Sequence, residues 1–172
     1  MADLLPGSTH SLIRPATADD VPSLVAIREA VAGEERWIGL ELPIDHAREA
    51  AILRDGIANP HNVWLVVEVD GLLVGYGGIH DDDHGHGDVF MALLGGHRGR
   101  GFGGRLLGEA LASARSSGRF HKILLAVWPH NVAALALYRK FGFIVEGYRH
   151  SHWRRASGEL WDVVLMGLLL EA

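Results

Sequence analysis

The 172-residue chain contains no cysteine, and this absence removes several kinds of chemistry. Without a thiol the chain forms no disulfide, offers no cysteine nucleophile and binds no zinc ion through thiolates. The apolar run at residues 163–170 is far shorter than the roughly 20 residues that a membrane-spanning helix needs. We therefore expect no membrane partner and no covalent intermediate on sulfur.

Positive charge is also scarce. The formal net charge is −5 at pH 7, whereas nucleic-acid binding needs concentrated lysine and arginine. The arginines gather mainly at residues 98–105, which argues for a small anionic ligand there and against a nucleic-acid partner. No internal repeat or long Pro/Gly/Ser linker is visible, and the first residues lack the layout of a signal peptide. We expect a single domain over residues 1–172 and a cytoplasmic location.

A dense group of glycines and arginines stands out at residues 95–105. The apolar run at residues 89–94 before it has the length of a buried strand. The helix predicted after it has an apolar face formed by Phe102, Leu106, Leu107, Ala110, Leu111 and Ala114. Glycine lets successive backbone N–H groups turn toward one oxyanion, and a helix N-terminus adds its positive dipole end. The segment therefore indicates a phosphate site for an anionic cofactor.

Two familiar phosphate loops do not fit this segment. A Walker loop needs a lysine and a hydroxyl side chain, and neither occurs between Gly95 and Leu107. The dinucleotide pattern G-x-G-x-x-G can be placed on Gly99, Gly101 and Gly104, but it belongs to the first strand–helix unit of a repeated βαβ array. Nearly a hundred residues precede it here. An ordinary glycine-rich turn with solvated arginines remains an alternative.

A second segment, residues 124–143, carries the local signals of a strand, a helix and a turn in consistent order. A short apolar strand is followed by Asn131, a favoured helix N-cap, and Gly142 suits the left-handed position after the helix. Leu135 and Tyr138 lie three residues apart on one side of that helix. Taken alone, Asn131 is explained by capping and Tyr138 by packing in the core.

The rest of the chain alternates between helix and strand patterns. Strands are predicted from residue 12, at 63–69 and at 72–79, with the last two joined by the two-residue turn Asp70-Gly71. Helices are predicted from Val21 to Gly33 and over residues 45–57. The C-terminal part indicates a hairpin of residues 143–149 and 160–170 around a turn at 156–158.

The two segments together resemble the acetyl-CoA motifs of the GNAT acetyltransferase superfamily. The pattern R/Q-x-x-G-x-G/A is matched by Arg98-Gly99-Arg100-Gly101-Phe102-Gly103. The second motif, in which Asn opens a helix, Leu-Tyr lies inside it and Gly-Phe leaves it, is matched by residues 131–143. The resemblance covers nearly the whole chain and implies an α/β GNAT fold, with a central mixed, mostly antiparallel sheet of about seven strands flanked by about four helices.

The resemblance also implies roles for particular residues. The expected acetyl-CoA contacts are the backbone near Met91 and Leu93 on the pantetheine arm, the loop residues Arg98, Gly99, Arg100, Gly101, Phe102, Gly103, Gly104 and Arg105 on the pyrophosphate, and Asn131 and Tyr138 from the second motif. The family's counterpart of Tyr138 often protonates the departing CoA thiolate, which makes Tyr138 the expected general acid.

The implied activity is transfer of an acetyl group from acetyl-CoA directly to a primary amine within one ternary complex. The C-terminal segment looks most like the branch that acetylates small molecules, such as amino acids and phosphinothricin. Acetylation of protein N-termini, aminoglycosides or polyamines on the same scaffold remains an alternative, as does a GNAT-fold acyl-CoA sensor without turnover. The family also suggests a homodimer through the C-terminal strands.

An amine acceptor must lose a proton, and the sequence leaves the base open. Glu34, Glu35 and Glu41 fall where the family forms part of the acceptor pocket, and Asp88 precedes the strand that carries Met91. Each of these carboxylates is equally explained as solvated surface. The His- and Asp-rich segment 80–88 contains metal-ligand types, but Asp and Gly between two strands are turn formers. We expect a hairpin loop there and no metal.

Overall fold

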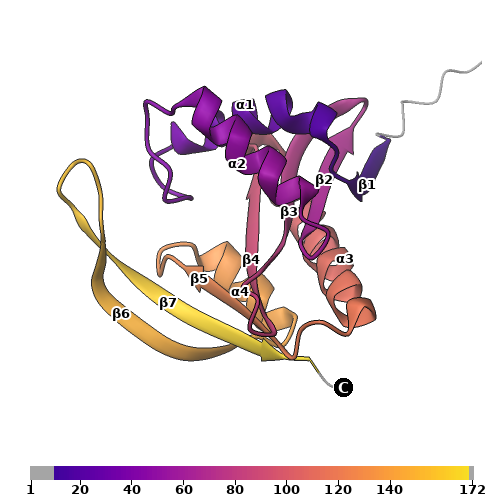
Figure 1. The fold of residues 1–172 in the computed structure, drawn as a ribbon. Coiled ribbons are helices and arrows are strands. Elements are labelled where there is room, and N and C mark those ends of the chain that lie inside the picture. Colours follow the sequence, from indigo (N-terminus) through magenta and orange to yellow (C-terminus); the bar gives the residue numbers. More distant parts are fainter. Residues whose placement is uncertain (1–9, 171–172) are drawn as a thin grey trace, which may run out of the picture.

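The computed structural model describes residues 10–170 and shows one seven-stranded sheet with helices on both faces (Figure 1). The strands are β1 (Ser11–Pro15), β2 (Val63–Val69), β3 (Leu72–Asp81), β4 (His86–Leu93), β5 (Lys122–Val127), β6 (Ile144–Arg154) and β7 (Leu160–Leu169). The α-helices are α1 (Val21–Ala32), α2 (His46–Ala58), α3 (Phe102–Ser117) and α4 (Val132–Lys140). The strand order is β1-β2-β3-β4-β5-β7-β6, and only β4 and β5 are parallel neighbours. The mixed, mostly antiparallel sheet expected from the resemblance is confirmed.

The Asp70-Gly71 turn forms as predicted, whereas the turn after β3 and the end of β6 differ from the prediction. Asp70 and Gly71 both have positive φ values, 50° and 82°, as a two-residue hairpin turn requires. The segment 80–88 is not a long loop, because β3 runs on to Asp81 and β4 begins at His86. The Asp82 carboxylate closes this short turn by accepting hydrogen bonds from the backbone N–H groups of His84 and His86. At the C-terminal hairpin, β6 continues five residues beyond the predicted end at residue 149.

Two clusters of buried apolar residues hold the helices against opposite faces of the sheet. On one face, α1 and α2 pack on Trp64, Val66, Tyr76 and Ala92. On the other face, α3 and α4 pack on residues of β2, β5 and β7, and the apolar face predicted for α3 is fully buried there. A cavity lies where these two layers meet the middle of the sheet.

The sheet is split in its middle. Strands β4 and β5 pair only at one end, where residues 86–88 of β4 lie opposite residues 122–124 of β5. Beyond this short ladder the two strands diverge, so that the later part of β4 has β3 on one side and no strand on the other. The split exposes backbone groups that a continuous sheet would pair, and it opens a path from one face of the sheet to the other.

The long hairpin of β6 and β7 forms one edge of the sheet (Figure 1), and its end packs against the segment between α1 and α2. Arg155, directly after β6, is 4% exposed and bonds to the segment between α1 and α2: its Nε lies 3.0 Å from the Glu41 carboxylate, and its Nη1 donates to the carbonyl of Ile38. Gly39 lies so close to the Trp153 ring that an added Cβ would come within 2.8 Å of it. The hairpin therefore fixes the position of the α1–α2 segment. Within residues 10–170, no helix has the length and apolar character of a membrane span.

Candidate active site

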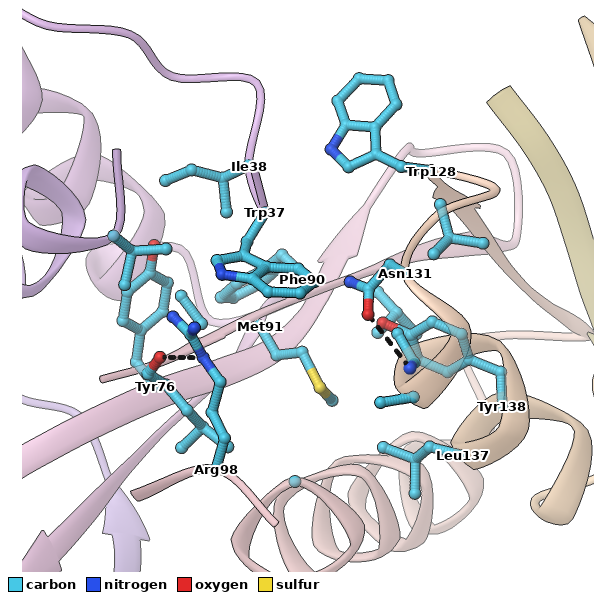
Figure 2. A pocket seen from close by; sticks show the side chains of 18 of the residues that line it. Trp37, Ile38, Tyr76, Phe90, Met91, Arg98, Trp128, Asn131, Leu137 and Tyr138 are labelled. Atoms are coloured by element: carbon cyan, nitrogen blue, oxygen red, sulfur yellow. Dashed lines mark hydrogen bonds between the residues drawn. The ribbon is translucent and has the colours of Figure 1, made fainter. Parts of the chain in front are cut away.

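A cavity of about 640 Å³ fills the split between β4 and β5. Figure 2 shows Phe90 and Met91 of β4 across from Asn131 and Tyr138, with Trp37 over the opening. The residues named from the sequence that line this cavity are Met91, Leu93, Arg98, Gly99, Gly101, Gly103, Gly104, Asn131 and Tyr138. Residues distant in the sequence are thus brought together around one space of a size typical for small-molecule sites.

One end of the cavity is suited to anionic groups. Helix α3 begins at Phe102 directly after Gly101, and its first turn carries no acidic side chain. Gly99 and Gly101 have φ values of 71° and 86°, which side-chain-bearing residues rarely adopt. A Cβ at either glycine would meet nothing within 4 Å, so the space above this loop is open. The unpaired N–H groups of the first turn and the positive end of the helix dipole face that space.

Each of the three arginines of the loop contacts other groups of the protein, and their contacts with a cofactor stay a prediction. Arg98 Nη1 and Nη2 bond to the Glu34 carboxylate at 2.6 and 2.7 Å, and this pairing lowers the pKa of Glu34. Arg105 donates to the hydroxyl of Ser11, and Arg100 lies over the ring of Phe102. Arg98 lines the cavity, whereas Arg100, Phe102 and Arg105 do not.

The free edge of β4 presents backbone groups to the cavity. The N–H of Leu94 donates to the Val74 carbonyl in β3 at 2.9 Å. Because the two polar groups of one peptide unit point in opposite directions, the carbonyl of Leu93 faces the split, where it accepts a hydrogen bond from Arg98 Nε. The backbone N–H and C=O groups of alternate residues in a strand point to the same side. Met91, two residues before Leu93, therefore also presents its backbone groups to the split.

Helix α4 forms the wall opposite β4. The Asn131 side chain accepts a hydrogen bond from the N–H of Ala134, which confirms its capping role. Tyr138 is 7% exposed, and burial raises its pKa to about 12. Its hydroxyl end points toward the cavity beside Asn131 (Figure 2). A tyrosine in this position stays protonated at neutral pH and can donate a proton to an anion formed in the cavity.

The other end of the cavity lies on the face covered by α1 and α2. Its walls are mainly aromatic, with Trp64, Tyr76 and Phe90 in mutual contact. Besides Tyr76, two polar side chains among the described residues line this end, Arg28 from α1 and His80 from β3. The sequence reasoning missed both as site residues. Continuing the strand alternation of Tyr76 and Gly78 to residue 80 would have placed His80 on this face.

Arg28 brings one polar group without a partner to this aromatic end. Its Nη1 lies 3.0 Å from Oε2 of Glu49 on α2, a side chain that is itself buried. Within the described residues, Arg28 Nε is buried without a hydrogen-bond partner. Buried polar atoms in folded proteins are nearly always paired, so this nitrogen indicates room for a polar ligand group.

The carboxylates named as base candidates lie outside the main cavity. Glu35 and Glu41 line a separate cavity of about 120 Å³, in which Glu41 is held by Arg155. Glu34 is held by Arg98, and Asp88 pairs across the sheet with His80 without lining the cavity. Burial is the main cause that raises the pKa of Asp88. Over residues 10–170, no group of three or more metal-ligand side chains converges on one point.

The cavity, the glycine-rich loop and the split sheet form the scaffold of a small-molecule site, and comparison with known proteins assigns the family. The family model described as "Acetyltransferase (GNAT) family" matches residues 26–143. The chain therefore belongs to the GNAT acetyltransferase family. The expected class of enzyme, an acetyl-CoA-dependent N-acetyltransferase, is confirmed at the level of this family.

Named relatives differ in the acceptors they act on. The N-alpha-acetyltransferase RimI of Mycobacterium tuberculosis is 35% identical over 113 residues, which cover 62% of this chain and 68% of that protein. An L-methionine sulfoximine/L-methionine sulfone acetyltransferase of Pseudomonas aeruginosa is 26% identical over 140 residues, 78% of this chain and 81% of that protein. An uncharacterised Mycobacterium leprae protein is 35% identical over 89% of this chain, which spans 42% of that relative's length.

Solved structures share the whole fold. A GNAT-family acetyltransferase of Streptococcus pneumoniae superimposes with a TM-score of 0.83 at 28% identity, covering 94% of this chain and all of that one. A Salmonella typhimurium protein solved with its cofactor acetyl-CoA has a TM-score of 0.84 at 22% identity, covering 95% of both chains. At 22% identity, the likeness to the Salmonella structure concerns the fold alone.

Proposed function

We propose that this protein transfers an acetyl group from acetyl-CoA to the primary amine of a small molecule, with an amino acid or an amino-acid analogue as the favoured acceptor. The observation that carries the proposal is one cavity that joins the glycine-rich loop of α3, through the split between β4 and β5, to an aromatic pocket under α1 and α2. A donor entering from one face and an acceptor entering from the other would meet between Met91 and Tyr138.

The donor end supports acetyl-CoA as the cosubstrate. In the proposed complex the N–H groups at residues 101–104 hold the pyrophosphate, as expected for a left-handed glycine loop that opens a helix. The backbone of Met91 and Leu93 pairs with the amide groups of the pantetheine arm, which would then take the place of a missing strand. The open space above Gly99 and Gly101 supports this placement, because a Cβ there meets nothing within 4 Å.

The acceptor end supports a small amine that carries an anionic group. Arg28 offers a guanidinium, and the planar fork of this group matches a carboxylate. The aromatic walls formed by Trp64, Tyr76 and Phe90 suit an apolar side chain. An amino acid has all three features, namely an amine, a carboxylate and a side chain. The Pseudomonas relative, whose name gives amino-acid analogues as its substrates, supports the same class.

The proposed reaction balances without a cysteine or a metal ion. The neutral amine attacks the thioester carbonyl carbon, so a C–N bond forms and the C–S bond breaks. Tyr138 gives its proton to the departing sulfur, and a base takes the proton that the nitrogen loses. The products are the N-acetylated acceptor and CoA with a free thiol.

Protein N-termini are the second candidate acceptors. This alternative is supported by the relative from Mycobacterium tuberculosis, an N-alpha-acetyltransferase at 35% identity. A peptide would reach the cavity through the opening under Trp37 and Ile38, at the α1–α2 segment. The cytoplasmic location, the homodimer through β6 and β7, and the absence of nucleic-acid and membrane partners stay predictions from the sequence.

The test is release of CoA from acetyl-CoA in the presence of an acceptor panel. The panel contains amino acids, methionine sulfoximine, phosphinothricin, polyamines, aminoglycosides and N-terminal peptides, and calorimetry measures acetyl-CoA binding in parallel. We expect turnover with an amino acid or analogue, and a much lower kcat/KM for the matching amine without its carboxylate. Tight acetyl-CoA binding without turnover on any acceptor would favour an acyl-CoA sensor and contradict the enzyme.

A further inference from the structure

The reaction needs a group that accepts the proton of the amine, and the cavity limits the choice sharply. Of the described residues that line it, those with ionisable side chains are Arg28, Tyr76, His80, Arg98 and Tyr138. The two guanidinium groups are permanently cationic and cannot accept a proton. Burial raises the pKa values of both tyrosines, which therefore keep their protons at neutral pH. The imidazole of His80 is the remaining candidate.

The position of His80 suits a base that must hold a fixed orientation. The side chain projects from β3 onto the face that carries Tyr76 and Phe90, at the acceptor end of the cavity. Its ring stacks on Phe90 at 4.4 Å between centroids and meets the edge of Trp64 at 5.5 Å. These two contacts restrict the ring without using its nitrogens, which have no hydrogen-bond partner among the described residues. A ring nitrogen is thus left for a ligand.

From this geometry we infer that His80 is the general base that deprotonates the acceptor amine. The inference rests on the proposed function. As the amine nitrogen bonds to the thioester carbon, its N–H proton passes to the neutral imidazole of His80. Tyr138 protonates the CoA sulfur, and the imidazolium proton returns to the tyrosinate through solvent. His80 and Tyr138 then complete one cycle without net gain or loss of a proton on the protein.

The surroundings of His80 favour its neutral form. Burial is the main cause that lowers the pKa of His80 below its ordinary value of 6.5. Two charged groups face it from neighbouring elements: Asp88 of β4 raises the pKa, and Arg28 of α1 lowers it. At neutral pH the imidazole is therefore unprotonated and can accept a proton. The base is lost as the pH falls through the lowered pKa, so the acid limb of the rate profile is expected below pH 6.5.

The experiment compares wild type, His80→Gln and the control His61→Gln on the acceptor found in the panel. His61 is exposed and lies outside the cavity. We expect His80→Gln to lower kcat at pH 7 by about 10²-fold or more, with acetyl-CoA affinity and melting temperature near wild type. The acid limb below pH 6.5 should disappear in this variant, and its rate should rise with pH as the amine deprotonates by itself. The control should keep the wild-type profile.

Three outcomes would overturn the assignment. The first is an unchanged kcat in His80→Gln, and the second is a reduced kcat with the acid limb retained. The third is a joint loss of melting temperature and acetyl-CoA affinity in both His80→Gln and His80→Asn, which would make the residue structural. A wild-type protein that turns over no acceptor contradicts the proposed function instead, so the two failures are distinguishable.

Discussion

At the scale of single residues, burial sets the proton chemistry of the cavity. Moving a group out of water disfavours its charged form, which raises the pKa of a phenol and lowers that of an imidazole. Tyr138 accordingly holds its proton, and His80 stays without one. The same low-polarity surroundings disfavour a bare thiolate, so the proton of Tyr138 has a reason to move to sulfur when the C–S bond breaks. The same burial would thus suit Tyr138 to the proposed role of acid and His80 to the proposed role of base.

The role of Tyr138 leads to a direct prediction. Replacing it by Phe removes the hydroxyl and keeps the ring that packs on Phe143, so the fold should persist. We expect kcat to fall by about 10²-fold, while acetyl-CoA affinity changes much less. Steady-state rates and calorimetry measure the two quantities. The matched control is Tyr148→Phe, an exposed tyrosine of β6 bonded to Asp162, which should have near wild-type activity.

Equal losses of kcat in the Tyr138→Phe and Tyr148→Phe variants would contradict a specific acid role for Tyr138. A wild-type rate in Tyr138→Phe would do so as well, and would shift protonation of the leaving group to water. Loss of acetyl-CoA binding alone would assign the hydroxyl to cofactor binding.

At the scale of elements, the hairpin of β6 and β7 determines the acceptor end of the cavity. Arg155 joins the hairpin to Glu41 and to the carbonyl of Ile38, and its guanidinium lies over the ring of Trp161 at 4.3 Å. Ile38 and Gly39, which this contact holds in place, line the cavity. The separate 120 Å³ cavity therefore lies at the contact that holds this wall in place, between a hairpin and a segment more than a hundred residues apart.

Removing the Arg155 side chain should weaken this contact. Arg155→Ala removes the ion pair to Glu41 and the donor to the Ile38 carbonyl, and it leaves Glu41 with the backbone N–H of Ala156 as its partner. We therefore expect the α1–α2 segment to loosen. The acceptor KM should rise by about tenfold, and unfolding should become easier by about 1–3 kcal/mol, the typical cost of an unsatisfied buried group. Acetyl-CoA affinity should change little, because Arg155 bonds to the α1–α2 segment and lies outside the main cavity. The neighbouring Arg154→Ala is the control, since Arg154 is exposed.

A larger change in acetyl-CoA affinity than in acceptor KM would show that the hairpin acts on the donor end, against this view. Kinetics at saturating acetyl-CoA and chemical denaturation supply the two numbers.

The elements with one buried face were predictable from sequence, and those without were not. Helix α3 was predicted from its apolar periodicity, and the β2–β3 turn from Asp70-Gly71. Strand β6 is an edge strand exposed along most of its length, so no alternation marks its end at Arg154. The turn between β3 and β4 was predicted too long, because His and Asp were assigned to a loop while His80 and Asp88 in fact pair across strands.

At the scale of the whole molecule, the decisive contacts join residues far apart in the chain. Arg98 and Glu34 are 64 residues apart, and Arg105 and Ser11 are 94 residues apart. No local pattern specifies such partners. For this reason the sequence indicated the loop and the helix that opens the anion site, but not which arginine faces the cavity. The carboxylate candidates lie outside the main cavity, and their positions were not predictable for the same reason, because charge and sequence position do not determine which cation a carboxylate meets.

Binding of acetyl-CoA in the split of the sheet should raise the stability of the entire fold. A ligand that binds only the folded state stabilises it by about 2.7 kcal/mol at one hundred times its Kd, which for a chain of this size corresponds to a melting shift of roughly 5–10 °C. We expect a shift of this order with acetyl-CoA, because the proposed pantetheine contacts would tie β4 to the rest of the cavity. Gly101→Ala should lose most of it, since strain at φ 86° disturbs the N–H groups of the loop.

The control for the loop is Gly71→Ala, which isolates backbone strain from ligand binding. Gly71 has nearly the same φ, 82°, and an added Cβ meets nothing within 4 Å at either position. Both variants should therefore lose similar stability in the absence of ligand, of the order of 1–2 kcal/mol. Only Gly71→Ala should then recover the full shift when acetyl-CoA is added. Equal shifts in the two variants, measured by scanning calorimetry, would show that the loop of α3 does not bind the cofactor, because strain alone would then explain every change.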